Sequence, residues 1–203
     1  MNRRYVGGLC VLVTAACLVA ALASSCTLFP GGPTRHEDGL GPLGNEGGGA
    51  AHTSDKVDPQ NGNQSEWTFG LRLCWFSGTL APVLTEVSPH STRGSGFHYL
   101  GSFIRVFDFQ PGNQGIISVA GYPPPTTYVP DQLQSFVGFD VTTPCTSPPS
   151  GLYTELLVGL ARDGSDGGGW EGVDVAYTDS GRSYVLTINE DLLICGDSTP
   201  CHS

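Results

Sequence analysis

The residues of this chain that could perform acid–base or nucleophilic chemistry are scattered and form no known motif. Five histidines lie far apart in the sequence: His36, His52, His90, His98 and His202. No Gly-x-Ser-x-Gly motif places a nucleophilic serine on a strand–turn–helix. Met1 is the only methionine, which excludes a methionine-based copper site. The sequence therefore predicts no catalytic, cofactor or metal site.

Two acidic stretches carry ligands or proton donors, but their spacing favours simpler roles. Residues 163–167 read Asp-Gly-Ser-Asp-Gly and lack the alternating ligands of an EF-hand loop. A hairpin turn requires the same residue types. Glu190 and Asp191 are adjacent, and adjacent side chains of an extended chain point apart. We interpret the first stretch as a turn, and the second as a solvated turn whose two carboxylates do not converge on one substrate.

Residues 122–130 combine prolines with two tyrosines and offer the best candidate for a partner contact. Proline favours a rigid extended or turn conformation and cannot donate to a sheet. Tyr122 and Tyr128 could therefore contact a peptide or glycan. The competing interpretation is a crossover between two sheets, with the rings packed on the core.

The first 26 residues have the parts of an export signal. Arg3 and Arg4 precede an uncharged apolar run over residues 6–22, and small residues follow it. Residues 22–26, Leu-Ala-Ser-Ser-Cys, resemble the lipobox of bacterial lipoproteins, with Ala23 where that family usually has a branched apolar residue. In that family the cysteine thiol receives a diacylglyceryl group, and a peptidase cuts just before it. The resemblance implies a signal peptide over residues 1–25 and lipidation of Cys26.

This resemblance also implies a location and a partner. The protein would be exported and held on the outer face of the cell membrane by its lipid. Plain secretion and an uncleaved anchor are the alternatives, because roughly 20 apolar residues can span a hydrocarbon core. The chain has 19 acidic and 9 basic residues, a net charge of −10. That charge repels phosphate backbones, so we expect no nucleic-acid partner.

Four cysteines beyond residue 26 predict two disulfides, as is usual for an exported protein. They are Cys74, Cys145, Cys195 and Cys201. No closely spaced pair such as Cys-x-x-Cys offers a metal site. Four cysteines allow three pairings. We expect a local Cys195–Cys201 bridge and a long Cys74–Cys145 bridge.

Composition and alternation divide the rest of the chain into two parts. Residues 26–66 are rich in glycine and proline, with few large apolar residues, and predict a flexible tether. From residue 67, apolar and polar residues alternate in short runs separated by turn residues. The clearest strands are residues 67–75, residues 152–160 and a hairpin that turns at residues 179–181. We predict an all-β domain over residues 67–203, an antiparallel β-sandwich of immunoglobulin-like type.

A β-sandwich hosts many functions and selects none of them. The sequence favours a non-enzymatic envelope lipoprotein that binds another envelope protein or a glycan. The alternative is an extracytoplasmic hydrolase or metal-dependent enzyme whose site is assembled only by folding.

Overall fold

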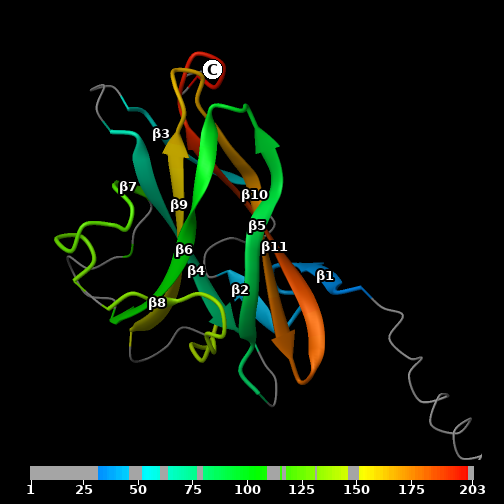
Figure 1. Ribbon diagram of the computed structural model, residues 1–203. Helices are drawn as coiled ribbons and strands as arrows, with labels where there is room; N and C mark the ends of the chain where they lie inside the picture. The colour runs from blue at the N-terminus through cyan, green and yellow to red at the C-terminus, as the bar shows by residue number, and fades with distance from the viewer. Residues whose placement is uncertain are drawn as a thin grey trace, which may run out of the picture. The chain divides into compact units, whose positions relative to one another are not determined.

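The computed structural model describes residues 32–45, 52–59, 64–76, 80–108, 115, 118–130, 132–145 and 151–200. Residues 33–203 form one compact unit. Eleven strands lie in two sheets, with β5, β10 and β11 on one side of this unit and β4, β6 and β9 on the other (Figure 1). The described residues contain no helix that could cross a membrane. The predicted all-β class is confirmed.

We call the first sheet sheet A. Its order is β1 (Thr34–Glu37), β11 (Arg182–Ile194), β10 (Gly168–Asp179) and β5 (Val83–Arg93), and β3 (Thr53–Val57) also pairs with β11. The β10–β11 hairpin turns at Ser180 and Gly181, both with positive φ, as the Asp-Ser-Gly sequence predicts. β1 and β3 run parallel to β11, along its first and second halves.

The second sheet, sheet B, is antiparallel throughout. Its order is β2 (Leu43–Asn45), β4 (Glu66–Trp75), β9 (Leu152–Arg162), β6 (Phe97–Asp108) and β8 (Gln134–Ser135), and β7 (Ser118–Ala120) pairs with β4. The alternation of Val137, Phe139 and Val141 predicts a strand over residues 134–141. In the structure the strand is shorter, and Gln134–Ser135 pair with β6.

Alternate residues of both sheets form one buried hydrophobic core. In β4 the core side chains are Phe69, Leu71 and Leu73, which follows the predicted period of two. In β10 they include Val173 and Val175. The opposite side chains of each strand therefore face away from the core, and the outer faces of the two sheets are where polar groups gather.

The prediction of a flexible tether over residues 26–66 is wrong for three of its segments. β1, β2 and β3 all lie inside this range and pair with β11 or β4. Leu43 and Val57 are 0% and 5% exposed and belong to the core. Such short strands draw their stability from a long neighbour rather than from their own composition. The predicted signal helix over residues 1–25 and Cys26 lie outside the described residues.

β5 is longer than its sequence indicates. Pro89 and the polar residues after it predict a loop, yet the strand continues to Arg93. β5 stands at the edge of sheet A, where it pairs with β10, and its first residues also bond to residues 138–140. A proline is tolerated in an edge strand where its missing N–H would face solvent.

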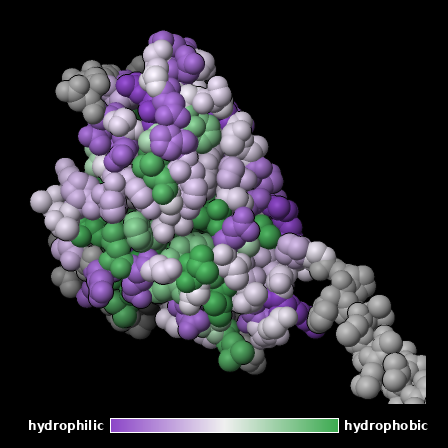
Figure 2. Space-filling model, viewed as in Figure 1, coloured by the Kyte–Doolittle hydropathy of each residue, from purple (hydrophilic) through white to green (hydrophobic). Residues whose placement is uncertain are grey.

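The surface mixes polar and apolar side chains. In Figure 2 hydrophilic residues dominate the upper end of the molecule, and hydrophobic residues are interspersed lower on the same face. The large apolar side chains that are most exposed include Leu80, Tyr128 and Val137. Scattered exposure of this kind is normal for a folded protein.

Candidate functional site

The two tyrosines proposed as partner contacts have different environments. The Tyr122 ring stacks on Phe103, with 5.6 Å between ring centroids, and lies on Gly159 of β9. Burial, and then the neighbouring Tyr99, raise the pKa of Tyr122 to about 12. Tyr128 is 64% exposed. Tyr122 thus packs on the outer face of sheet B; the segment joins β7 to β8 of that same sheet and is not the expected crossover between two sheets. Tyr128 is the tyrosine of this pair that a partner could reach.

The long disulfide is confirmed. Cys74 of β4 is bonded to Cys145, with 4.8 Å between their Cα atoms. Cys195 is also disulfide-bonded. Its predicted partner, Cys201, lies outside the described residues, so the local bridge stays a prediction.

The two acidic stretches differ in outcome. Asp163–Gly167 connects β9 to β10, as predicted, and Asp163 pairs with His98 at 2.9 Å, both exposed. Glu190 and Asp191 lie inside β11, so the prediction of a solvated turn is wrong. Asp191 is 3% exposed. Burial, and then the charge of Asp55, raise the pKa of Glu190 to about 7.

A polar groove lies on the outer face of sheet A, and we use this name for it below. Its volume is about 310 Å³, and it is lined by His52, His90, Ser91, Arg93, Glu171, Gly172, Asn189 and Asp191. β5, β10 and β11 supply all of these except His52, which precedes β3. Gly172 makes room here: its φ is +76°, the register of β10 shifts around it, and a Cβ would lie 3.2 Å from His90.

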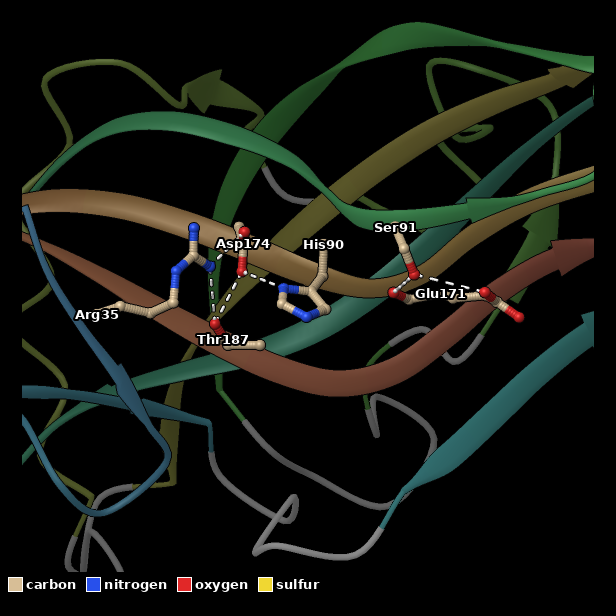
Figure 3. A network of polar contacts seen from close by, with 6 residues as sticks. All are labelled: Arg35, His90, Ser91, Glu171, Asp174 and Thr187. Atoms are coloured by element: carbon tan, nitrogen blue, oxygen red, sulfur yellow. Dashed lines mark hydrogen bonds and ion pairs between the residues drawn. The ribbon is translucent and has the colours of Figure 1, made fainter.

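Asp174 holds His90 beside the polar groove (Figure 3). The Asp174 carboxylate accepts from Arg35 at 2.5 Å, from Thr187 at 2.8 Å and from His90 Nδ1 at 3.2 Å. When the imidazole is neutral and donates from Nδ1, its Nε2 carries a lone pair. His90 could therefore accept a proton or a hydrogen bond from a ligand.

Glu171 is held at the next position along β10. Arg93 donates to its Oε1 from Nε at 2.6 Å. Ser91 donates to its Oε2 at 3.4 Å, as Figure 3 shows. The Ser91 hydroxyl is thus directed at Glu171, although His90 is its neighbour in the chain. The structure does not arrange Ser91, His90 and Asp174 as a nucleophilic triad.

Asp191 is the second carboxylate that lines the polar groove. Its Oδ2 pairs with His52 Nε2 at 3.1 Å, and the His52 side chain is 61% exposed. Its Oδ1 is buried and has no hydrogen-bond partner among the described residues. A buried polar atom without a partner destabilises a fold by about 1–3 kcal/mol, and by more when it is charged. This oxygen is the least satisfied acceptor of the groove.

The sequence alone did not find the polar groove. Sequence reasoning named Asp191, His52 and His90, but it did not place them together in one site. The signal that could have helped is the polar side of the β10–β11 hairpin, where Asp174 and Thr187 are paired in register. Outward polar residues on paired strands share one face of a sheet.

Comparisons with known proteins add no relative. No family model, no curated protein and no solved structure matches this chain. Among the described residues, no group of three or more His, Cys, Asp or Glu side chains could hold a metal ion.

Proposed function

We propose that this protein is an exported lipoprotein, held at the outer face of the cell membrane by a lipid on Cys26. Its folded part is a non-enzymatic binding module for another component of the envelope. The lipobox-like residues 22–26 and the Cys74–Cys145 disulfide support export. We also propose a β-sandwich, supported by two sheets that share one core. An immunoglobulin-like connectivity stays a prediction.

The polar groove is the observation that carries the binding function. It places two histidines, two carboxylates and the Asn189 amide on one outer face, with Asp174 beside them. Oriented donors and acceptors of this kind fix a ligand and give specificity. Secretion without a lipid remains the alternative location.

Photo-crosslinking in intact cells tests the binding function. A photoreactive residue at Ser91, on the groove, should give a discrete adduct with one envelope component. The same residue at Arg182, on the exposed tip of the β10–β11 hairpin, is the matched control. The proposal is rejected if both positions give the same adducts, or if neither gives any.

The anchor has its own test. Intact mass of the mature protein should show cleavage before Cys26 and an added diacylglyceryl group. Cys26→Ser should abolish the added mass and release the protein from the membrane fraction. A mature wild-type protein of unmodified mass would contradict lipidation.

A hydrolase is the second candidate function, and the Asp174–His90 pair is the observation that favours it. A carboxylate that orients an imidazole can make it a general base for an attacking water. Purified protein should then hydrolyse at least one member of a panel of esters, amides and phosphodiesters. His90→Gln should reduce that rate by at least 100-fold, and absence of turnover in the panel would reject this candidate.

A further inference from the structure

Three carboxylates lie in the polar groove or beside it, and they differ in the donors that reach them. Asp174 accepts from three side chains, including the Arg35 guanidinium. Glu171 accepts from Arg93 and from Ser91. Asp191 has a single partner, the ring of His52, which touches one of its two oxygens. Asp191 is therefore the one carboxylate of this groove that no arginine of the described chain neutralises.

Burial makes this difference chemically significant. The Asp191 side chain is 5% exposed, so water screens its charge weakly. Its Oδ1 lies beneath the surface and is not satisfied by the described chain. In the His52–Asp191 pair, the His52 side chain is 61% exposed, so this ring is the partner that can rotate into solvent. A ligand that reaches both oxygens would therefore take the place of this ring.

We infer that Asp191 anchors an arginine side chain of the protein partner, and that His52 covers Asp191 until the partner binds. This inference rests on the proposed binding function. A guanidinium presents parallel N–H donors that match both oxygens of a carboxylate, and it carries no acceptor. Arg35 and Arg93 already pair with the other two carboxylates, each through one carboxylate oxygen, so an arginine at Asp191 would extend a pairing that this face of the sheet uses twice.

The size and charge of the site agree with this ligand. The polar groove, of about 310 Å³, can accept one long side chain. The chain carries a net charge of −10, which favours association with a basic partner surface. Neutral hydroxyls would supply donors but no charge, and a metal ion would need ligands that the described residues do not group together.

The test uses a matched pair of probes with the full chain. N-acetyl-arginine amide is compared with N-acetyl-citrulline amide, which has the same shape and no charge, at constant ionic strength. Amide chemical shifts of Asn189 and Asp191 report binding. We expect the arginine probe to bind with a millimolar dissociation constant, and at least tenfold more tightly than the citrulline probe. Equal binding of the two probes would overturn the inference.

Three variants separate the roles of the two residues. Asp191→Asn should weaken binding of the arginine probe at least tenfold. His52→Ala should tighten binding about threefold, because it removes the competing ring. Asp163→Asn, which alters an exposed pair in the β9–β10 turn outside the lining of the polar groove, should change nothing. Weaker binding in His52→Ala would overturn the covering role of His52. Because His52 is exposed, we expect this variant to fold, so it tests the covering role even if Asp191→Asn fails to fold.

Crosslinking from Ser91 distinguishes failure of this inference from failure of the proposed function. If the envelope adduct persists in Asp191→Asn, the binding module stands and the arginine anchor is rejected. If the wild-type chain gives no adduct, the binding module is rejected whatever the probes show. Tighter binding of N-acetyl-lysine amide than of the arginine probe would overturn the assignment to arginine.

Discussion

On the outer faces of the two sheets, a buried carboxylate has partners that differ in their exposure to solvent. On sheet B, Glu155 of β9 and Arg105 of β6 are each 1% exposed and pair at 2.5 Å. On sheet A, Asp191 is equally hidden, but its partner His52 is 61% exposed. A buried ion pair is satisfied within the chain. A buried carboxylate with a solvent-exposed partner can exchange that partner for a group from outside.

The difference follows from what covers each face. The segment 118–130 lies over sheet B: Thr68 of β4 donates to the Gly121 carbonyl, and the Tyr122 ring rests on Gly159. Residue Leu157, on the outer side of β9, is 0% exposed. Sheet A has the polar groove at the corresponding place. We therefore expect sheet B to contribute mainly stability, and the proposed binding function assigns recognition to sheet A.

The largest difference between the two faces is expected when one arginine charge is removed from each of them. Arg105→Met should lower the free energy of unfolding by about 3–5 kcal/mol, because it leaves Glu155 buried and without its guanidinium. Arg93→Met, on the polar groove, should lower it by at most about 1 kcal/mol, since its pair with Glu171 is partly exposed. Urea unfolding measures both. Equal losses would remove the distinction between the two faces.

Removal of the Cys74–Cys145 bridge should cause the next largest loss of unfolding free energy. It spans 71 residues, and its removal in Cys74→Ala/Cys145→Ala should lower the free energy of unfolding by about 4 kcal/mol in the entropy model. Thermal and urea unfolding check this. The matched control is Cys195→Ala/Cys201→Ala, whose predicted short loop should contribute only about 2 kcal/mol. The reverse ranking would show that the long bridge adds little constraint.

A third test concerns the contact that covers sheet B. A Cβ at Gly159 would lie 2.2 Å from the Tyr122 ring, so the ring must move in Gly159→Ala. We expect a loss of about 1–3 kcal/mol in unfolding free energy. In a Tyr122→Ala background the same substitution should have almost no effect. A double-mutant cycle measures this coupling, and additive losses would mean that Tyr122 does not press on β9.

The smallest effect is expected from Glu190, the neighbour of Asp191 on β11. Its pKa of about 7 lies above the usual 4.5, so between these values the folded form keeps a proton that the unfolded form releases. The free energy of unfolding should therefore fall as pH rises from about 4.5 to 7, and level off above it. Glu190→Gln should flatten this slope and gain on the order of 1 kcal/mol at pH 8, after allowance for the water that reaches this half-buried carboxyl.

Urea unfolding at pH 5 and pH 8 gives the slope for both proteins. The exposed Asp163 supplies a control, because Asp163→Asn should leave the slope as it is in the wild type. A Glu190→Gln variant with the wild-type slope would assign the pH dependence to other groups.

Local pattern was enough to predict the strands that bury their own apolar face. β4 alternates strictly, β9 is apolar on both sides, and the β10–β11 hairpin has a clear turn. In these strands the local alternation of apolar and polar residues is sufficient to predict the structure. β1 and β3 do not, because they bury little and exist through their pairing with β11.

The polar groove could not be predicted, because its parts meet only in three dimensions. Arg35 and Asp174 are 139 residues apart, and the space beside His90 depends on an irregularity at Gly172. The extended pattern predicts that Glu190 and Asp191 point apart, and of the two Asp191 lines the polar groove. It missed their burial, because the segment taken as a tether contains β3, which pairs with β11 beside them.

The proline of β5 has a consequence for how crowded copies of this domain behave. An edge strand is a template to which a strand of another molecule can add, which leads to aggregation. Pro89 breaks the row of N–H donors near the middle of that edge. Copies concentrated on a surface would therefore resist pairing through their edge strands, and β5 would stay paired with β10.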